Sequence, residues 1–471
     1  MNSDCVSHPL TRFVADLQFG EIPAEVAEVA SLCVLDTCAA MVCGAISPVA
    51  RMGADYALSA WRAGRASVLA TGARQTAVAA AFANAIAANG TDLDDVGRYT
   101  WGHPGAMIVP TALALAEERG ATGAGFIAAV VVGYEVAFRA GRCVNFGVGA
   151  PPVDAAREYR ACGSWGASAC AAVAAHLSHL PAQQIAQALG IADYHAPEAP
   201  MMRDLETPAM VKHANGIGAM TGIQAAGLAS RGFTGIVSRL YADAHRAWVL
   251  DIGRDYLLPR AVSWKRFSCC SFAHAALDAV EQLRRRYGPF ADRVRRIRVQ
   301  AYSDAVRLGA RVPDDSEQAQ FSLSWPIAVM AMDGEVHPRA MSPERVRDPR
   351  TRALAGRVEV RESAELTARY LISEAEQPGG EEAALVEVEL DDGTILGPVK
   401  GINVLFPDEL PERHAVEAKF RWAAADALPP ARIDALCRLA EELPRLGNLG
   451  DFARLLVPPR TDGHQDINSR D

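Results

Sequence analysis

The long helical stretch between residues 22 and 260 is the feature that most constrains the fold of this chain. Hydrophobic residues recur there at helical spacing, and Gly, Pro and Asn separate the successive segments. Helices are predicted over residues 23–44, 48–63, 76–88, 105–119, 123–141, 162–177, 181–192 and 212–231. Many are rich in Ala, Gly and Ser on every side, so we expect them to pack closely as buried helices.

The pattern changes near Ser263, where alternating hydrophobic and polar residues replace the helical spacing. Residues 294–302, 357–361 and 384–390 alternate as half-buried strands do, and Asp392-Gly393 then signals a hairpin turn. Further helices are predicted over residues 272–287, 321–332 and 343–354. Residues 263–405 are therefore expected to form an α+β domain. Helical spacing returns over residues 415–427, 430–443 and 449–456, and we expect this tail to dock on the first helices.

Composition narrows the possible partners and the compartment. A net charge of −9 and a pI near 5.7 argue against nucleic acid and against an anionic membrane as partners. The ten cysteines include no C-x-x-C pair, so no zinc or iron–sulfur site is indicated, and a reducing compartment is expected. Residues 1–20 lack the apolar segment of a signal peptide.

Glu135 and Arg139 interrupt the apolar helix at 123–141, which favours a core helix with a structural ion pair. The expected location is the cytoplasm.

A loop at residues 89–104 carries the best candidate for acid–base chemistry. The helix before it ends at Asn89-Gly90, residue types that tolerate positive φ. Three carboxylates and one imidazole follow: Asp92, Asp94, Asp95 and His103. Histidine has an unperturbed pKa near neutrality, and any of the three aspartates could orient its ring. The alternative is a loop in which the aspartates bind main-chain amides and the histidine only packs.

Cationic side chains elsewhere are candidates for binding a carboxylate. Lys212 opens the helix at 212–231, where its charge adds to the positive end of the helix dipole; the alternative is a solvated surface lysine. Lys265 and His274 lie where the composition changes, and clefts tend to form at domain junctions. Arg157 could clamp a carboxylate but cannot act as a base; its alternative role is an ion pair with Glu158.

The sequence gives little support for a cysteine nucleophile or for cofactor-dependent and metal-dependent chemistry. Cys269 and Cys270 could be nucleophiles, but no Cys–His signature supports this, so structural thiols are favoured. The sequence lacks G-x-G-x-x-G after a strand, a Walker A motif, H-E-x-x-H and G-x-S-x-G. We therefore expect chemistry without a cofactor or a metal ion.

The order of these motifs resembles the MmgE/PrpD family, which includes 2-methylcitrate dehydratase, cis-aconitate decarboxylase and iminodisuccinate epimerase. The matching segments are Asn84, residues 89–95, His103-Pro104-Gly105, residues 133–136 and 163–172, Lys212 with residues 222–226, residues 265–270 with His274, residues 321–325 and residues 417–420. The resemblance covers nearly the whole chain. It implies a mainly α fold in which residues 1–262 and 406–471, from both chain ends, form a large helical domain. Residues 263–405 would be a smaller inserted α+β lid, with the active site between the two domains of a homodimer.

The resemblance also carries roles for individual residues. Asp92, His103, Lys212 and Lys265 fall on the family's active-site positions. The chain departs from the family in two places, with Arg157 where a second catalytic histidine is usual and Trp325 where a tyrosine is usual. Arg157, Tyr159, Lys212, Lys265, His274 and Trp325 are therefore expected to contact the substrate.

Together, the residues and the resemblance predict a lyase or isomerase acting at a carbon α to a carboxylate. His103 would move the proton while the lysines stabilise the negative charge that develops. The first hypothesis is a hydro-lyase on a small di- or tricarboxylic acid, with water or Tyr159 as the acid for the departing hydroxyl. The second is an epimerase or decarboxylase on a related acid. The third is a catalytically silent binding protein of the same fold.

Overall fold

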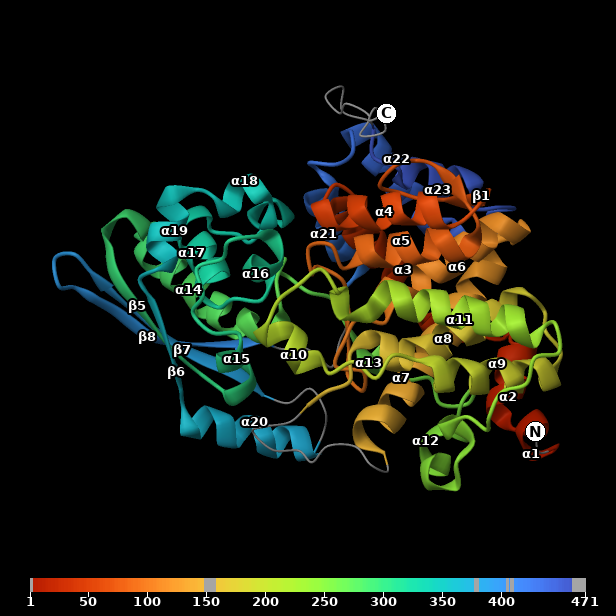
Figure 1. The fold of residues 1–471 in the computed structure, drawn as a ribbon. Helices are drawn as coiled ribbons and strands as arrows, with labels where there is room; N and C mark the ends of the chain where they lie inside the picture. Colours follow the sequence, from red (N-terminus) through yellow and green to blue (C-terminus); the bar gives the residue numbers. More distant parts are fainter. Residues whose placement is uncertain (1–2, 148–157, 377–380, 404–405, 407–410, 460–471) are drawn as a thin grey trace.

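The computed structural model describes residues 3–147, 158–376, 381–403, 406 and 411–459. The described chain is mainly α-helical, as predicted (Figure 1). The helices before the sheet are α1 (Ser3–Ser7), α2 (Pro9–Asp16), α3 (Ala24–Ala45), α4 (Pro48–Ala60), α5 (Ala77–Ala88), α6 (Gly105–Arg119), α7 (Gly123–Phe146), α8 (Cys162–Leu177), α9 (Ala182–His195), α10 (Met201–Glu206), α11 (Asn215–Ala229), α12 (Arg246–Val249) and α13 (Leu258–Ala261). The predicted helices at 105–119 and 162–177 have the same bounds as α6 and α8.

Small residues allow α8 and α11 to pack against each other at close range. A Cβ on Gly218 of α11 would lie 2.8 Å from the Cα of Gly163 in α8, and a Cβ on Gly222 would lie 2.6 Å from the Ala167 carbonyl oxygen. Helix α8 is buried on every side and also contacts α6, α7 and α9. The close packing expected of the Ala-, Gly- and Ser-rich segments is therefore present.

Two long helices lie in this core although they are apolar enough to cross a membrane. Helices α3 and α7 pass such a test by length and composition, but 89% of each apolar window is buried inside the protein. In α7, Glu135 and Arg139 are fully buried and paired, and the Glu135 carboxylate also accepts hydrogen bonds from the amides of Leu257 and Leu258. The pair therefore has the structural role that was expected.

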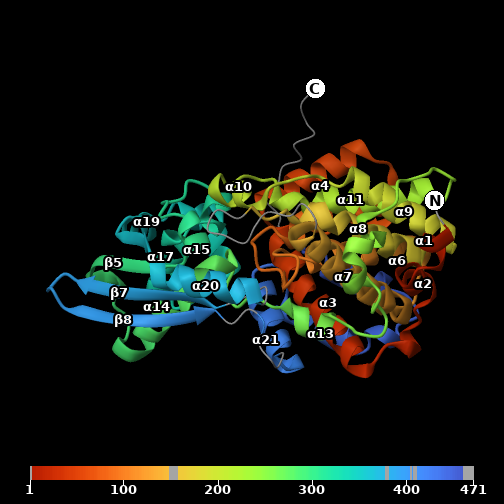
Figure 2. The same cartoon turned by 90° about the horizontal axis from the view of Figure 1, so that it is seen from below.

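A four-stranded sheet and the helices beside it form a second lobe, at the left of Figure 1. We call it the sheet lobe, and we call the remaining helices the helical body. The strands of the sheet are β5 (Val294–Ala301), β6 (Val358–Glu362), β7 (Glu382–Leu390) and β8 (Ile395–Asn403). The spatial order is β6-β5-β7-β8, with β5 and β6 parallel and the other pairs antiparallel. Figure 2 shows β5, β7 and β8 side by side. Gly393 has a φ of +84° in the turn between β7 and β8, as expected of the Asp392-Gly393 signal.

The helices of this lobe lie beside the sheet (Figure 1). They are α14 (His274–Tyr287), α15 (Ser303–Arg307), α16 (Ser316–Gln320), α17 (Ser324–Asp333), α18 (Pro343–Val346), α19 (Pro349–Ala355) and α20 (Ala364–Glu376). Helix α14 contacts β7 and β8. The helix predicted over 343–354 is two helices, because Asp348 caps α19 and Pro349 occupies its first turn.

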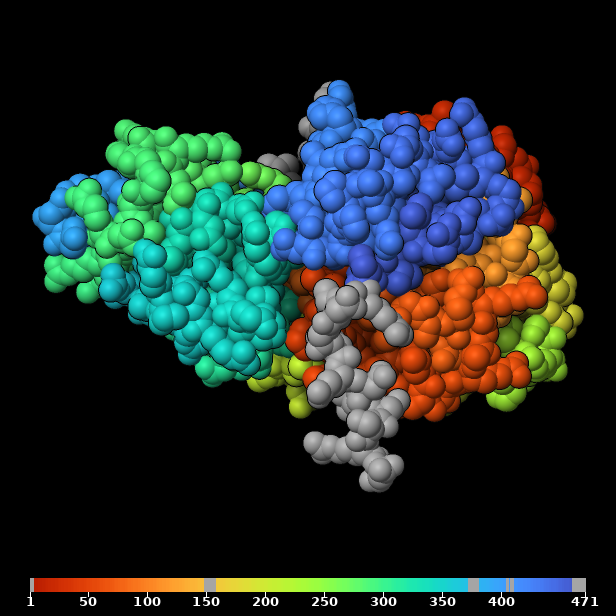
Figure 3. All heavy atoms as spheres, turned by 90° about the horizontal axis from the view of Figure 1, so that it is seen from above, coloured from red at the N-terminus to blue at the C-terminus, as the bar shows by residue number. Residues whose placement is uncertain are grey.

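The C-terminal helices return to the helices of the N-terminal half. Helices α21 (Arg413–Ala424) and α22 (Pro430–Glu441) contact α3, and α23 (Gly450–Leu456) contacts α6. Figure 3 shows this segment in blue against the cyan surface of the sheet lobe. In that region Trp422 Nε1 donates to Glu335 Oε2 at 2.8 Å, and His337 Nε2 lies 2.8 Å from the Trp422 carbonyl oxygen.

Some elements lie outside the predicted pattern. Strands β1 (Ala63–Ser67) and β2 (Arg74–Gln75) form a short antiparallel pair after α4, where the sequence pattern predicted the end of a helix. Strands β3 (Val96–Gly97) and β4 (Val262–Ser263) also pair, although more than 160 residues separate them in the chain. This second pairing brings the loop that contains His103 to the segment that contains Lys265.

Candidate functional site

The loop between α5 and α6 is held by its own polar side chains. Asn89, which ends α5, donates from Nδ2 to Asp92 Oδ1 at 3.1 Å and to Asp94 Oδ1 at 2.9 Å. Asp95 accepts a hydrogen bond from the amide of Gly105 at the start of α6 and another from the Tyr134 hydroxyl. Asp95 therefore has the helix-capping role of the alternative interpretation, while Asp92 and Asp94 face the site.

Burial gives the three carboxylates different pKa values. Burial raises the pKa of Asp95 to about 8, and the nearby charges of Asp36 and Asp94 act in the same direction. Burial also raises the pKa of Asp94 to about 6, against the charge of Lys265. For Asp92 the effect of burial is outweighed by the charge of Lys265, and its pKa falls to about 2. Asp92 is therefore ionised at neutral pH, whereas Asp95 is mostly protonated.

The imidazole of His103 has one nitrogen bound and one nitrogen facing a carboxylate. Its Nδ1 lies 2.8 Å from the main-chain carbonyl oxygen of Asp95, which can only accept a hydrogen bond, so Nδ1 carries the proton. Burial, and next the charge of Lys265, hold the pKa of His103 well below its ordinary value, so the ring is neutral. Its Nε2 then carries a lone pair and lies 3.5 Å from Asp92 Oδ1. The group that orients the ring is the Asp95 carbonyl rather than the carboxylate of Asp92.

Lys265 follows β4 and is held beside the same loop. Its Nζ lies 2.8 Å from Asp92 Oδ1 and donates to the Asp92 carbonyl oxygen at 2.9 Å. Burial alone would lower the pKa of Lys265, but the carboxylates of Asp92 and Asp94 raise it above its ordinary value. Lys265 is therefore a permanent cation beside His103, in a site where its charge is little screened by water.

Lys212 and His213 reach the site on an unusual stretch of backbone. Lys212, His213 and Ala214 have φ values of +47°, +51° and +59° before α11 begins. Each non-glycine residue in this region costs about 1–3 kcal/mol, and such residues concentrate at functional sites. The carboxylate of Asp204 supports the stretch by accepting the amide of His213 at 3.2 Å.

His213 is a site residue that the sequence analysis did not single out. Its ring stacks on that of His103, with 5.2 Å between centroids and 17° between planes. Its Nδ1 lies 2.9 Å from Asp204 Oδ2, and its ring also meets the edge of Phe321. In the sequence, the only sign of this role was that His213 lies beside Lys212, just before an apolar helix. The direction of the His213 side chain depends on the left-handed backbone, which the sequence does not reveal.

Residues of the sheet lobe contribute to the site through α16. Lys212 Nζ donates to Glu317 Oε2 and to Gln320 Oε1, both at 2.8 Å, and lies 5.8 Å from the ring centroid of Phe321. Gln320 also donates to the carbonyl oxygen of Gly90 at 3.2 Å. Sequence reasoning missed Glu317 and Gln320, because their roles depend on how the lobe is placed against the loop.

The other predicted contact residues lie in different surroundings. His274 is buried near Lys265, its Nε2 lies 3.3 Å from the Cys269 carbonyl oxygen, and burial lowers its pKa to about 3. The Tyr159 hydroxyl donates to Asp304 Oδ2 at 3.0 Å in the sheet lobe. Trp325 is fully buried within that lobe and donates from Nε1 to the Ala340 carbonyl oxygen at 3.0 Å. Arg157 lies outside the described residues.

The two adjacent cysteines are packing residues in this structure. Cys269 and Cys270 are both buried, and burial raises the pKa of each thiol above its ordinary value. Neither thiol is therefore a thiolate at neutral pH, so neither has the ionisation state that a nucleophile requires.

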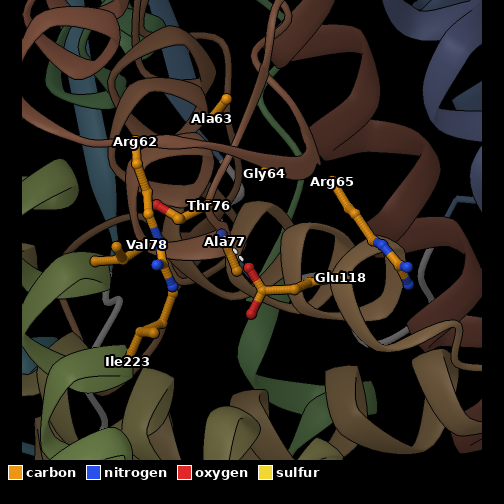
Figure 4. A pocket seen from close by; sticks show the side chains of 9 residues that line it. All are labelled: Arg62, Ala63, Gly64, Arg65, Thr76, Ala77, Val78, Glu118 and Ile223. Carbon is orange, nitrogen blue, oxygen red and sulfur yellow. Dashed lines mark hydrogen bonds between the residues drawn. The ribbon is translucent and has the colours of Figure 1, made fainter.

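The site is closed over its own polar groups. His103 is 6% exposed, and Lys212, His213 and Lys265 are each exposed by less than 5%. A pocket of about 480 Å³ lies elsewhere, between β1, the start of α5 and α11 (Figure 4). Its lining includes Arg62, Arg65 and Glu118 and none of the predicted site residues. In this closed state Lys212 is bound to Glu317.

Among the described residues, one cluster has the composition of a metal site. Asp92, His103 and His213 each offer a ligand atom, and these three atoms lie within 4.8 Å of one another. The cluster unites side chains from the loop after α5 and from the turn before α11, with Lys265 in contact with Asp92.

Comparisons with known proteins match this chain over most of its length. Residues 8–249 match the model of the MmgE/PrpD N-terminal domain, and residues 267–443 match that of the MmgE/PrpD C-terminal domain. A cis-aconitate decarboxylase of Aspergillus terreus (strain NIH 2624 / FGSC A1156) is 25% identical, and another from Aspergillus terreus is 24% identical. Each alignment covers 96% of this chain and 96% of the relative. Since these matches extend over most of the sequence and support a lyase-type enzyme, the chain belongs to the MmgE/PrpD family.

Proposed function

We propose that this protein is a lyase that removes a proton from the carbon α to a carboxylate of a small di- or tricarboxylic acid and expels water. The observation that carries the proposal is the neutral imidazole of His103, whose Nε2 lone pair faces the Asp92–Lys265 pair and the ring of His213. Family membership supports the lyase class. Acid–base groups of the chain itself are enough to account for each proton transfer.

His103 is suited to be the base. The Asp95 carbonyl holds the proton on Nδ1, which leaves the lone pair on Nε2, the nitrogen beside Asp92. When Nε2 takes the α proton, the ring becomes positively charged, and Asp92 at 3.5 Å stabilises that charge. Because the carboxylate of Asp92 remains ionised at neutral pH, this stabilisation is in place before the reaction begins.

His213 supplies the acid that the sequence analysis left to water or Tyr159. Its ring is parallel to that of His103, so the two imidazoles can face neighbouring carbon atoms of one small substrate. In the imidazolium form, with Asp204 beside Nδ1, Nε2–H of His213 would protonate the departing hydroxide. The electron pair of the broken C–H bond then forms the C=C bond, and water leaves.

The two lysines bind the substrate carboxylates in this proposal. Lys265 Nζ is already placed beside His103, and it would stabilise the negative charge that develops as the α proton leaves. Lys212 would exchange Glu317 for a substrate carboxylate when the sheet lobe opens. This exchange keeps the lysine paired in both states, as a buried charge requires.

Decarboxylation is a second candidate, favoured by the names of the two relatives. It would use the same cations to bind the carboxylates and one imidazole to protonate the carbon that loses carbon dioxide. The protein would then need one acid instead of a base and an acid.

Turnover in D₂O with citrate, 2-methylcitrate and cis-aconitate distinguishes these reactions. Loss of water with solvent exchange at the α carbon supports dehydration, and release of carbon dioxide with one deuteron incorporated supports decarboxylation. Exchange with inversion alone would instead indicate epimerisation. Tight binding without any turnover would overturn both lyase candidates.

Replacing His103 by Gln tests the role of the base. We expect kcat/KM to fall by about 10²–10⁴, the usual contribution of general acid–base catalysis, with little change in thermal stability. His176→Gln is a matched control, because His176 is also buried but binds the Val14 carbonyl oxygen in another part of the helical body. A His103→Gln enzyme with unchanged kcat/KM would contradict the proposed mechanism.

A further inference from the structure

Three side chains of the site converge in the way that the ligands of a transition-metal ion do. The ligand atoms of Asp92, His103 and His213 all lie within 4.8 Å of one another, and all three residues are buried. Two imidazoles and one carboxylate form a common ligand set for zinc and related divalent ions. In a tetrahedral zinc site the ligand atoms are about 3.4 Å apart, so side-chain shifts of about 1–1.5 Å would complete the geometry.

The second ring nitrogen of each histidine is already bound or faces a carboxylate. His103 donates from Nδ1 to the Asp95 carbonyl oxygen at 2.8 Å, and His213 Nδ1 lies 2.9 Å from Asp204 Oδ2. A carbonyl or a carboxylate at the far nitrogen is the partner that most metal-binding histidines have, because it holds the proton there and leaves the other nitrogen as the ligand. Nε2 of His103 is therefore a free donor, and the carboxylate beside Nδ1 of His213 favours Nε2 as the free donor of that ring.

The carboxylate of Asp92 also keeps one oxygen for a ligand. Its Oδ1 is bound to Lys265 Nζ and to Asn89 Nδ2, whereas its buried Oδ2 has no hydrogen-bond partner in the described structure. A buried carboxylate oxygen without a partner carries a desolvation cost that a cation would remove. The carboxylate of Asp94, which lies 3.4 Å from His103 Nδ1, offsets the positive charge of Lys265 beside the cluster.

We propose that Asp92 Oδ2, His103 Nε2 and His213 Nε2 bind a divalent transition-metal ion of the zinc class when no substrate is present. The bound ion occupies both imidazole lone pairs. If His103 and His213 transfer protons as the proposed function requires, the metal-bound protein is inactive, and the metal acts as a reversible inhibitor that substrate carboxylates displace.

Metal binding to the full-length protein, stripped with a chelator and free of substrate, tests this proposal. Equilibrium dialysis against Zn²⁺ should give one tight equivalent per chain. Co²⁺ should give the intense visible absorption of a four-coordinate site with nitrogen and oxygen ligands. Both the Zn²⁺ equivalent and the Co²⁺ absorption should be lost in His213→Ala. They should also be lost in His103→Gln, which serves as a second variant in case His213→Ala does not fold. His176→Ala should retain them, because that histidine lies outside the cluster.

Two results would overturn the proposal: wild-type protein that takes up no tight equivalent of Zn²⁺, or folded variants of His103 and His213 that bind it as tightly as wild type. These readouts need no substrate. A protein that binds Zn²⁺ but turns over no carboxylic acid would contradict the proposed lyase function alone. Turnover without metal uptake would contradict the metal site alone.

Discussion

The ion pair of Asp92 and Lys265 controls the arrangement of the site at the scale of single residues. Both side chains are at least 96% buried, and their charged atoms lie 2.8 Å apart. Replacing Lys265 by Met leaves Asp92 as a buried charge without its cation, so we expect the free energy of unfolding to fall by about 3–5 kcal/mol. The double variant Asp92→Asn/Lys265→Met should regain part of this loss. Denaturant titration measures both, and a Lys265→Met protein as stable as wild type would contradict the expectation.

Asp95 makes the stability of the fold depend on pH. Burial raises its pKa from 3.8 to about 8, so at neutral pH the folded protein holds a proton that the unfolded chain has released. The contribution of this group to stability is therefore complete below about pH 4 and is lost as the pH rises toward 8. In Asp95→Asn, the melting temperature should fall less between pH 5 and pH 8 than in wild type. Equal decreases in the two proteins would show that Asp95 is ionised in the folded state.

Helix α11 provides a matched test at the scale of the element. Gly222 faces α8, where an added Cβ would lie 2.5 Å from the Cβ of Cys170 and 2.6 Å from the Ala167 carbonyl oxygen, whereas Gly227 has space for one. Gly227→Ala should raise the free energy of unfolding by about 0.5–1 kcal/mol through helix propensity. Gly222→Ala should instead destabilise the protein, because the backbone of α8 must move. Chemical denaturation of the two variants measures the difference, and equal effects would contradict the packing described here.

The sequence pattern predicted which segments are helical, but it did not predict the ends of several helices or the short strands. The apolar spacing of α6 and α8, with Pro104 before the first and small residues throughout the second, was enough to predict both helices with their bounds. Strand β1 has no alternating apolar pattern, since it contains Ala63, Gly64, Arg65, Ala66 and Ser67. Its conformation comes from pairing with β2, a tertiary interaction that no local pattern encodes.

An exposed apolar face on α4 and α11 bears on the assembly of the whole molecule. Met52 on α4 and Ile217 on α11 are 57% and 42% exposed, and both helices contact α5. Monomers seldom expose contiguous apolar patches of large size, so we expect a second copy of the chain to cover this face. The pocket in Figure 4 lies near it, between the start of α5 and Ile223 of α11.

Light scattering after size exclusion tests this assembly. Wild type should have about twice the chain mass of 50.2 kDa, and Met52→Lys/Ile217→Lys should shift toward the monomer. Ile395→Lys, on the exposed β8 hairpin of the other lobe, is the control and should leave the mass unchanged. A monomeric wild type, or a double variant with the wild-type mass, would rule out this face as the dimer interface.

The sequence by itself determined that the chain is mainly α-helical, that small residues pack its central helices, and that His103 lies on a capped loop rich in carboxylates. These features follow from local spacing and from residue types whose conformational preferences extend over a few neighbours. Only the tertiary structure decided which nitrogen of His103 is free, that His213 stacks on it and that Glu317 binds Lys212. Each of these depends on partners far along the chain, or on left-handed backbone that only the surrounding contacts hold in place.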